Sequence, residues 1–455
     1  MPPDSRIRAS WTPSRLALLA TGVIFVALCF SILPDGLVWN NDSTDIDAVG
    51  GSTLRRLQWM PLFLLAAYIV WRRRVVTLAL LPGINPFLLV FIAYATLSVL
   101  WSPYPGVTVR KLVLLYGLVL IGLTPLVAGW YPGRFADLLR NAFTLMLVVS
   151  VFLALFLPQI GKEPDGEFAG YWRGARSTKN LLAALAAAGG LLWVHALATG
   201  RTTLARGLAG LAVATLCLLM SRGKTGLLTF VVSAPLLWLV ARPPIRARYL
   251  LPTALLAGLV LLVVPLFAFI LAMERLPTLT DITTPIALAV GKDPTLTSRD
   301  QLWLMMWEHI QSHWLLGFGY DSFWLGTTGP SGEIAEKLYW LPWQAHNGYV
   351  DLLNETGVVG VALFLGFALV HLRQILRLAA VDRGNAALHL ALFVTILMSN
   401  VSESSLFRGL TIYWLMLLFS SLSLTRALSA RVPRLLADAG GRTQAGDPEG
   451  DRPCA

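Results

Sequence analysis

The chain has 455 residues, of which 56% are apolar and only 13% are charged, and its mean hydropathy is +0.66. This composition excludes a set of ordinary soluble domains and indicates a membrane protein. Lys and Arg outnumber Asp and Glu by 36 to 25, which in a membrane protein points to lipid headgroups, loop orientation and anionic substrates rather than to nucleic acid. The cysteines Cys29, Cys217 and Cys454 have the spacing of neither a metal site nor a disulfide framework.

Twelve stretches are apolar enough to cross a bilayer, since a hydrocarbon core of about 30 Å needs about 20 mostly apolar residues. They are approximately 14–33, 56–71, 85–102, 108–129, 139–157, 180–199, 204–220, 225–241, 249–272, 357–372, 386–405 and 409–425. We therefore predict an all-α polytopic membrane protein with about 12 transmembrane helices. The second, seventh and eighth stretches are short, so ten or eleven spans remain an alternative. The first stretch has no small-residue cleavage site and is not expected to be a cleaved signal.

The predicted organisation follows from the charges, because basic residues mark cytoplasmic loops. Residues 1–13 form a cytoplasmic N-terminus and 14–272 hold transmembrane helices 1–9. Residues 273–356 form one large outer loop with amphipathic helices, periplasmic in a bacterium, which precedes the tenth helix. Helices 10–12 occupy 357–425, and 426–455 form a cytoplasmic tail whose small, polar, Pro- and Gly-rich sequence predicts disorder.

Some basic residues lie on the outer side and break this rule: Arg173, Arg176, Lys179, Arg222, Lys224, Arg299 and Arg408. Cations gathered at the outer membrane surface suit a phosphorylated or diphosphorylated amphiphile. Alternatively, Arg222 is a snorkelling arginine of a tight hairpin, and Arg299 is a surface charge at the start of an interfacial helix. The segment SRGKTG around Arg222 lacks the spacing and preceding strand of a P-loop, so an ATP-driven activity is not expected.

Six histidines occur, and His346 stands apart because it lies in the polar segment WQAHNGYVDLLNETG just before the tenth span. We expect a polar half-helix here, with Gly357 and Gly360 permitting close helix approach. His195, His371 and His389 fall in or beside apolar spans and are expected to be packing residues. His309 and His313 have the spacing of a metal pair but no third ligand at a standard offset, so no metal site is predicted.

The pattern His346-Asn347, nine residues, then Gly357-x-x-Gly360 resembles the motif of the O-antigen ligase and polysaccharide polymerase family of bacterial membrane glycosyltransferases. Val361 departs from the residue that usually follows. The resemblance covers about 170–420 and includes Lys179-Asn180, Ser221-Arg222, Arg299 before an amphipathic helix, and GFGYDSFW at 317–324. These pieces look more like exopolysaccharide polymerases than lipopolysaccharide-core ligases.

The resemblance implies a metal-independent, inverting transfer of a polyprenyl-diphosphate-linked glycan to an acceptor sugar at the periplasmic face of the inner membrane, with no cofactor. It implies three catalytic residues, which are His346 as base or as a diphosphate ligand, and Arg222 and Arg299 as the family's functional arginines. Candidate substrate-binding residues are Arg173, Lys179, Lys224 and Asn347. The three cations among them have the alternative of being surface charges.

The expected partners are the lipid-linked donor, a saccharide acceptor, membrane lipid and a chain-length regulator, with no nucleic acid. Polymerisation of exopolysaccharide or O-antigen repeat units is the favoured activity, and ligation to lipid A core is the neighbouring alternative. A transporter or flippase for lipid-linked sugars is an alternative of another class, and a non-catalytic scaffold is a third. The tryptophans Trp303, Trp324, Trp340 and Trp343 are expected either to stack on sugar faces or to form an interfacial belt.

Overall fold

The computed structural model describes residues 14–34, 53–127, 130, 133–164, 166–242, 299–338 and 340–429. All regular elements in these ranges are helices, beside one isolated bridge between Lys162 and Trp172. They are α2 (Arg15–Ile32), α4 (Thr53–Arg72), α5 (Arg74–Leu80), η2 (Leu81–Gly83), α6 (Pro86–Leu97), η3 (Ser98–Leu100), α7 (Pro105–Val127), α8 (Arg134–Phe156), α9 (Pro158–Gly161), η4 (Gly166–Phe168), α10 (Lys179–Ala198), α11 (Leu204–Ser221), α12 (Lys224–Ala241), α15 (Arg299–Ser312), α16 (Gly329–Leu338), α17 (Gly348–Ala379), α18 (Arg383–Ser399) and α19 (Ile412–Ala427). A polytopic helical membrane protein is thus confirmed.

Seven of the described helices are long and apolar enough to cross a membrane, namely α2, α7, α8, α10, α11, α12 and α17. An eighth span results if α5 with η2 and α6 with η3, which are bent by 104° at their junction, count as one. The helices α18 and α19 are apolar but have only 17 and 16 residues. The count of twelve stays a prediction, and its ninth span, 249–272, lies outside the described residues.

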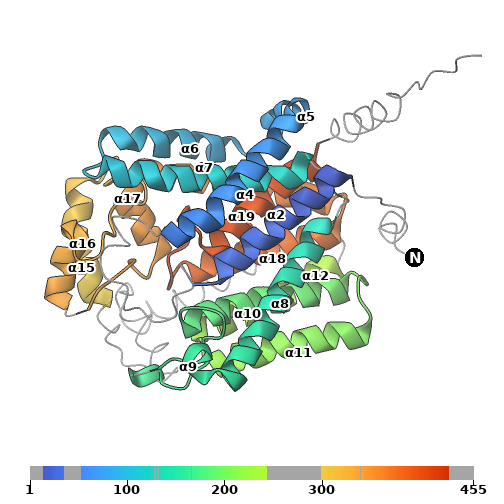
Figure 1. Ribbon diagram of the computed structural model, residues 1–455. Helices are drawn as coiled ribbons and strands as arrows, with labels where there is room; N and C mark the ends of the chain where they lie inside the picture. Colours follow the sequence, from blue (N-terminus) through green and yellow to red (C-terminus); the bar gives the residue numbers. More distant parts are fainter. Residues whose placement is uncertain are drawn as a thin grey trace, which may run out of the picture.

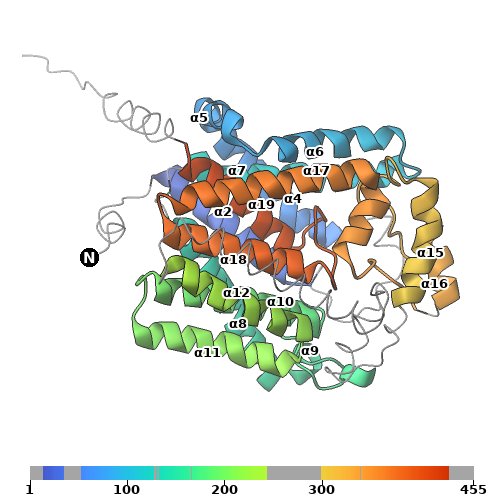
Figure 2. The same cartoon turned by 180° about the vertical axis from the view of Figure 1, so that it is seen from behind.

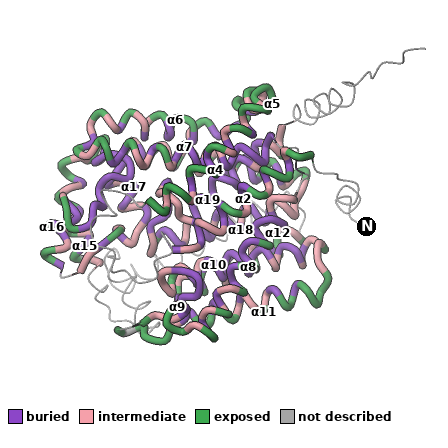
Figure 3. Tube along the Cα trace, in the orientation of Figure 1, coloured by how far each residue is buried: buried purple, intermediate pink, exposed green. Residues whose placement is uncertain are grey.

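The long helices form a bundle around α19, which is buried along nearly its whole length (Figure 3). This helix packs against α2, α7, α17 and α18. Its first turn meets an aromatic cluster in which Phe407 stacks on Phe91, with ring centroids 3.7 Å apart, and contacts Trp414 at 4.6 Å. A second group of helices, α8, α10, α11 and α12, packs beside it through α18 (Figure 1).

The helices α15 and α16 lie together at one end of the long helices, as the two opposite views show (Figures 1 and 2). They share a small apolar core of their own, built from Leu302, Met306, Ile310, Phe318, Phe323, Trp324, Ile334, Leu338 and Ala345. This layer covers the ends of the bundle and positions the segment before α17. The side of the membrane that it faces stays a prediction from the charges.

The helix α17 is broken at Gly357, whose backbone angles are φ 63° and ψ −170°. The chain after α15 passes through this break, because Val358 N donates to Trp314 O at 2.9 Å and Phe318 N donates to Asn354 O at 2.9 Å. A Cβ at Gly357 would lie only 2.3 Å from Leu315 O. The expected polar half-helix is therefore present, but its glycine permits a strained backbone and a crossing loop rather than the approach of another helix.

Candidate active site

His346 lies directly before α17, at the point where the chain turns into the helix. Its backbone is left-handed, with φ 52°, and its side chain is half-buried. Asn347 then caps α17, because its Oδ1 accepts from Tyr349 N at 3.0 Å and from Val350 N at 3.3 Å. The local sequence thus fixes the start of the helix and the position of the imidazole. A contact of Asn347 with substrate stays a prediction.

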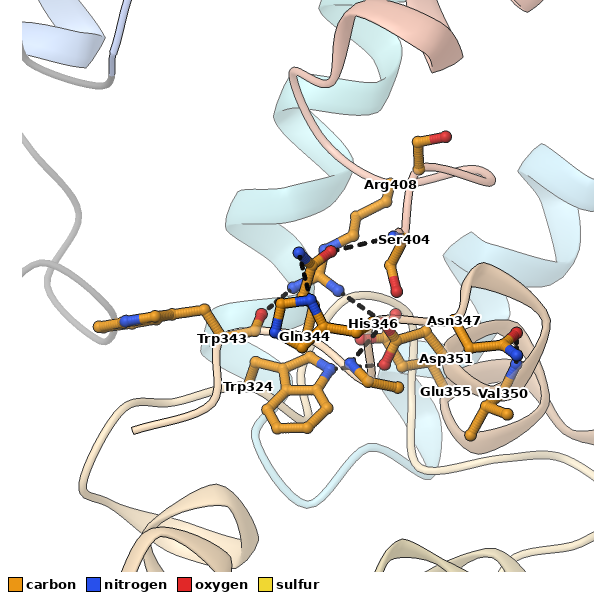
Figure 4. Close-up of polar contacts among 12 residues, drawn as sticks. Trp324, Trp343, Gln344, His346, Asn347, Val350, Asp351, Glu355, Ser404 and Arg408 are labelled. Atoms are coloured by element: carbon orange, nitrogen blue, oxygen red, sulfur yellow. Dashed lines mark hydrogen bonds and ion pairs between the residues drawn. The ribbon is translucent and has the colours of Figure 1, made fainter. Parts of the chain in front are cut away.

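The loop between α18 and α19, residues 400–411, faces His346. Glu403 places Oε2 at 3.7 Å from His346 Nδ1 and accepts a hydrogen bond from Gln344 Nε2 at 2.9 Å. Its other oxygen, Oε1, accepts from Asn180 Nδ2 at 3.1 Å. Gln344 is itself held, since its Oε1 accepts from Ser404 N at 3.0 Å. Figure 4 shows Gln344 and His346 together beside Ser404 and Arg408.

The neighbouring residue, Ser402, joins two more of the predicted site elements. Its carbonyl oxygen accepts from Arg299 Nη1 at 3.3 Å, and its hydroxyl lies 2.8 Å from Thr225 Oγ1. Thr225 belongs to the first turn of α12, directly after the turn that carries Arg222. The loop 400–411 therefore brings together His346, Arg299 and the α11–α12 turn, which are far apart in sequence.

The charges around Glu403 act on its ionisation. Burial alone would raise the pKa of the Glu403 carboxyl, but its interaction with His346 and the positive charge of Arg299 bring that pKa below its ordinary value. The hydrogen bond from Asn180 acts in the same direction. Glu403 is therefore an anion at neutral pH.

Arg222 ends α11 in a left-handed conformation, with φ 51°, and its side chain is exposed. Its guanidinium lies 4.7 Å from the centre of the Tyr171 ring and donates to Tyr171 Oη at 3.2 Å. Lys179 Nζ lies 4.9 Å from the same ring and 3.8 Å from the ring of Phe168. The structure thus brings Arg222 and Lys179 to one aromatic platform. Lys224 is exposed at the start of α12.

Four helices begin beside the loop 400–411. Residues in or next to the first turn of each contact the loop: Asn180 of α10, Thr225 of α12, Arg299 of α15 and Gly348 of α17, whose N–H donates to Asn400 O at 2.8 Å. Helix N-termini carry a partial positive charge and present N–H groups, so they favour anions. With the nearby cations, this arrangement suits a ligand that bears several negative charges.

Two further cations of the predicted outer side donate hydrogen bonds to backbone carbonyl oxygens of other segments. Arg173 is buried and donates through Nε to Ile160 O at 2.9 Å and through Nη2 to Gln159 O at 3.3 Å. Arg176 donates to Ser31 O at 2.7 Å. These contacts give both arginines a structural role, and a substrate contact of Arg173 stays a prediction.

Sequence reasoning missed a second polar network beneath His346, centred on Asp351. The Asp351 carboxylate pairs with Arg408 at 2.9 Å, accepts from Trp324 Nε1 at 2.7 Å and accepts from Ala345 N at 3.0 Å (Figure 4). Arg408 also donates to Trp343 O. Arg408 had been noticed as a cation on the predicted outer side, but its acidic partner in YVDLLNE and the acid Glu403 in VSESSLFRG had not been singled out.

The four tryptophans of the predicted outer loop have different environments. Trp324 is buried against Asp351, so the prediction that it stacks on a sugar or joins a belt is wrong. Trp303 donates to Ala345 O at 2.8 Å. The Trp340 ring lies 6.0 Å from the His346 ring, and Trp343 is exposed. Trp340 and Trp343 remain candidates for sugar contact.

Among the residues that the structure describes, no group of three His, Cys, Asp or Glu side chains is arranged to hold a metal ion. His313 Nδ1 instead lies 2.8 Å from Ser312 Oγ, and the His309 ring packs edge-on against Phe323. That the reaction needs neither metal nor cofactor stays a prediction.

Comparison with known proteins adds two findings. A family model described as O-antigen ligase matches residues 207–365, a range that contains Arg222, Arg299, His346 and Gly357 but neither Lys179 nor Glu403. The chain is also 25% identical over 307 residues to the exopolysaccharide production protein ExoQ of Rhizobium meliloti. That match covers 64% of this chain and 66% of the relative, slightly less than two thirds of its length.

Proposed function

We propose, from the premise that this chain belongs to the O-antigen ligase and polysaccharide polymerase family, that it transfers a polyprenyl-diphosphate-linked glycan to an acceptor sugar. The reaction takes place at the periplasmic face of the inner membrane and extends an exopolysaccharide by repeat units. The observation that carries the proposal is the meeting of His346, Arg299 and the Arg222 turn around the loop 400–411.

The diphosphate of the donor binds to the cations at this loop. Arg222 and Lys179 both contact the Tyr171 ring. Arg299 contacts Ser402, which also contacts the start of α12, directly after the turn that carries Arg222. Negative charge grows on the diphosphate as it leaves, so fixed guanidinium groups stabilise the transition state more than the bound donor. Arginine suits this role because its planar fork matches two phosphate oxygens.

His346 acts as the base. The acceptor hydroxyl oxygen forms a bond to C1 of the donor sugar while the bond from C1 to the diphosphate oxygen breaks, and its electron pair leaves with the diphosphate. The hydroxyl proton passes to the imidazole of His346. Attack opposite to the leaving group inverts the configuration at C1. Assistance of this kind accelerates a reaction by about 10² to 10⁴.

The test is a strain with His346→Ala whose glycans are analysed on the lipid carrier and in the polymer. We expect polymer to be lost and single repeat units to accumulate on the carrier. Normal polymer with no accumulation would remove His346 from the mechanism.

Arg222 is tested by Arg222→Lys and Arg222→Ala, with Arg206→Ala as the matched control. Arg206 is exposed near the opposite end of the same helix, so its loss tests the effect of removing a positive charge from α11. We expect Arg222→Lys to lose most activity, because an ammonium group lacks the fork. Full activity of Arg222→Ala would contradict the diphosphate assignment.

Ligation of finished O-antigen to lipid A core is the second candidate, favoured by the description of the matching family model. It predicts long chains, rather than single units, on the carrier in the His346→Ala strain. The name of the relative concerns exopolysaccharide production, which favours polymerisation. Within the proposal both termini are cytoplasmic, membrane lipid surrounds the helices, and a chain-length regulator is a further partner.

A further inference from the structure

We infer that Glu403 is the positioning residue for His346, holding the imidazole in the form that accepts a proton from the acceptor sugar. The inference rests on the proposed function and deepens it, because it names a partner of the base that lies outside the region matched by the family model. Glu403 itself touches no reacting atom.

The geometry places the Glu403 carboxylate against one nitrogen of the ring. Oε2 lies 3.7 Å from His346 Nδ1, and Gln344 Nε2 lies 2.9 Å from that oxygen and 3.4 Å from the same nitrogen. Asn180 holds the second oxygen, Oε1, at 3.1 Å. The carboxylate is thus fixed from two sides and presents one oxygen to the histidine.

This contact selects one tautomer of His346. Two groups compete for Nδ1, because the Gln344 amide, 3.4 Å away, would donate to an unprotonated Nδ1, whereas the Glu403 carboxylate favours an Nδ1–H. The amide already donates to Oε2 at 2.9 Å, and an unprotonated Nδ1 would direct its lone pair at the lone pairs of that charged oxygen, so the carboxylate decides between them. The proton therefore resides on Nδ1, and Nε2 keeps the lone pair that a base needs. When Nε2 takes the acceptor proton, the carboxylate also stabilises the imidazolium that results.

Among the residues that the structure describes, no other acidic side chain lies beside Nδ1 of His346. Asp351 is committed to Arg408, Trp324 and the backbone of Ala345. Glu163 accepts from Lys179 N at 2.7 Å. The charged groups that act on Glu403 are His346 itself and Arg299, which reaches the loop from α15. Gln344 and Asn180 are neutral, so Glu403 supplies the negative charge.

The first experiment measures transfer by the full-length purified protein, with a polyprenyl-diphosphate-linked repeat unit as donor, across pH 5 to 9. In Glu403→Gln, which keeps shape but removes charge, we expect kcat to fall about 10- to 100-fold while KM for the donor stays within about twofold. The acid limb of the pH–rate profile should move to lower pH, because the imidazolium loses its partner. Glu403→Asp should restore the wild-type pH profile in part, and Glu336→Gln, at an exposed position on α16, is the matched control.

The second experiment reads the tautomer without activity, by ¹⁵N NMR of the protein labelled at histidine. The His346 signal is identified by its loss in His346→Ala. We expect the Nδ1–H form in the wild type and a shift toward the Nε2–H form in Glu403→Gln. The melting temperature of each variant in detergent shows that it is folded.

The outcomes separate this inference from the proposed function. If His346→Ala is inactive while Glu403→Gln keeps full kcat, pH profile and tautomer, the role of Glu403 is overturned and the proposed function stands. If His346→Ala is fully active, His346 is removed from the proposed mechanism, and the NMR result alone decides whether Glu403 orients the ring. A uniform loss of activity in Glu403→Gln, with unchanged pH profile and tautomer, would show a merely structural residue.

Discussion

The ion pair between Asp351 and Arg408 supports the whole segment that carries His346. The two side chains lie 2.9 Å apart and are only 7% and 17% exposed, in that order. Removing one partner of a buried pair leaves an uncompensated charge and costs about 3–5 kcal/mol. We therefore expect Asp351→Ala and Arg408→Ala each to lower the free energy of unfolding by this amount. Asp351→Ala should also reduce activity, because the Asp351 carboxylate holds the N–H of Ala345 beside His346.

The double variant distinguishes this reasoning from a simple loss of contacts. Once one charge is gone, removing the other no longer leaves a buried ion, so the double variant should lose less than the sum of the single losses, by about 1–3 kcal/mol. The assay is denaturant unfolding in mixed micelles followed by tryptophan fluorescence, with the exposed Arg206→Ala as control. Single losses below about 1 kcal/mol, as for a surface pair, or strict additivity would refute the reasoning.

Three further predictions concern the helix break, the cation platform and the ionisation of the loop. Gly357→Ala should lower the free energy of unfolding by at least about 1–3 kcal/mol, because its φ of 63° and ψ of −170° suit only glycine. Gly106→Ala, which has open space around the added Cβ, should leave the free energy of unfolding unchanged in the same denaturant titration. Tyr171→Phe keeps the ring and loses only the hydroxyl bond to Arg222, so it should retain most activity. Tyr171→Leu loses two cation–π contacts and should raise KM for the donor about tenfold. Equal KM values for the two variants in steady-state transfer assays would refute the role of the aromatic platform. Because the folded-state pKa of Glu403 is lowered from 4.5, its ionisation stabilises the protein above that value and the stabilisation is lost as pH falls below it. The difference in unfolding free energy between wild type and Glu403→Gln should therefore shrink as the pH falls below 4.5, and a difference that stays constant or grows over that range would contradict the assignment.

Most of the fold could be predicted because a membrane helix is visible in the sequence as a long apolar stretch. The stretches predicted at 180–199, 204–220 and 225–241 differ by no more than one residue at either end from α10, α11 and α12. The break at Gly357 could not be located in the same way, because the strained backbone depends on the chain that crosses it after α15. Apolar patterning shows where a membrane-spanning helix lies, but a loop that crosses such a helix produces no periodic pattern in the sequence.

Members of the candidate site could be proposed from the sequence where a residue was unusual for its surroundings, and could not be proposed where a residue was ordinary. Arg222 and Arg299 were singled out as cations on the predicted outer side, and His346 as part of a motif. Glu403 and Asp351 are single acids in short polar segments, and nothing local distinguishes them from solvent-exposed charges. Their importance comes from partners distant in sequence: 223 residues separate Glu403 from Asn180, and 57 separate Asp351 from Arg408.

The position of loop 400–411 between the last two described helices bears on when a newly synthesised molecule first becomes competent. A nascent chain threaded into the bilayer only as far as α17 already possesses Arg222, Arg299 and His346, but it lacks Ser402 and Glu403, which link them. Contacts of such long sequence separation form late, after much of the polypeptide has been ordered. If the proposed function holds, a chain that ends before α18 and α19 lacks part of the candidate site, and we expect it to be inactive.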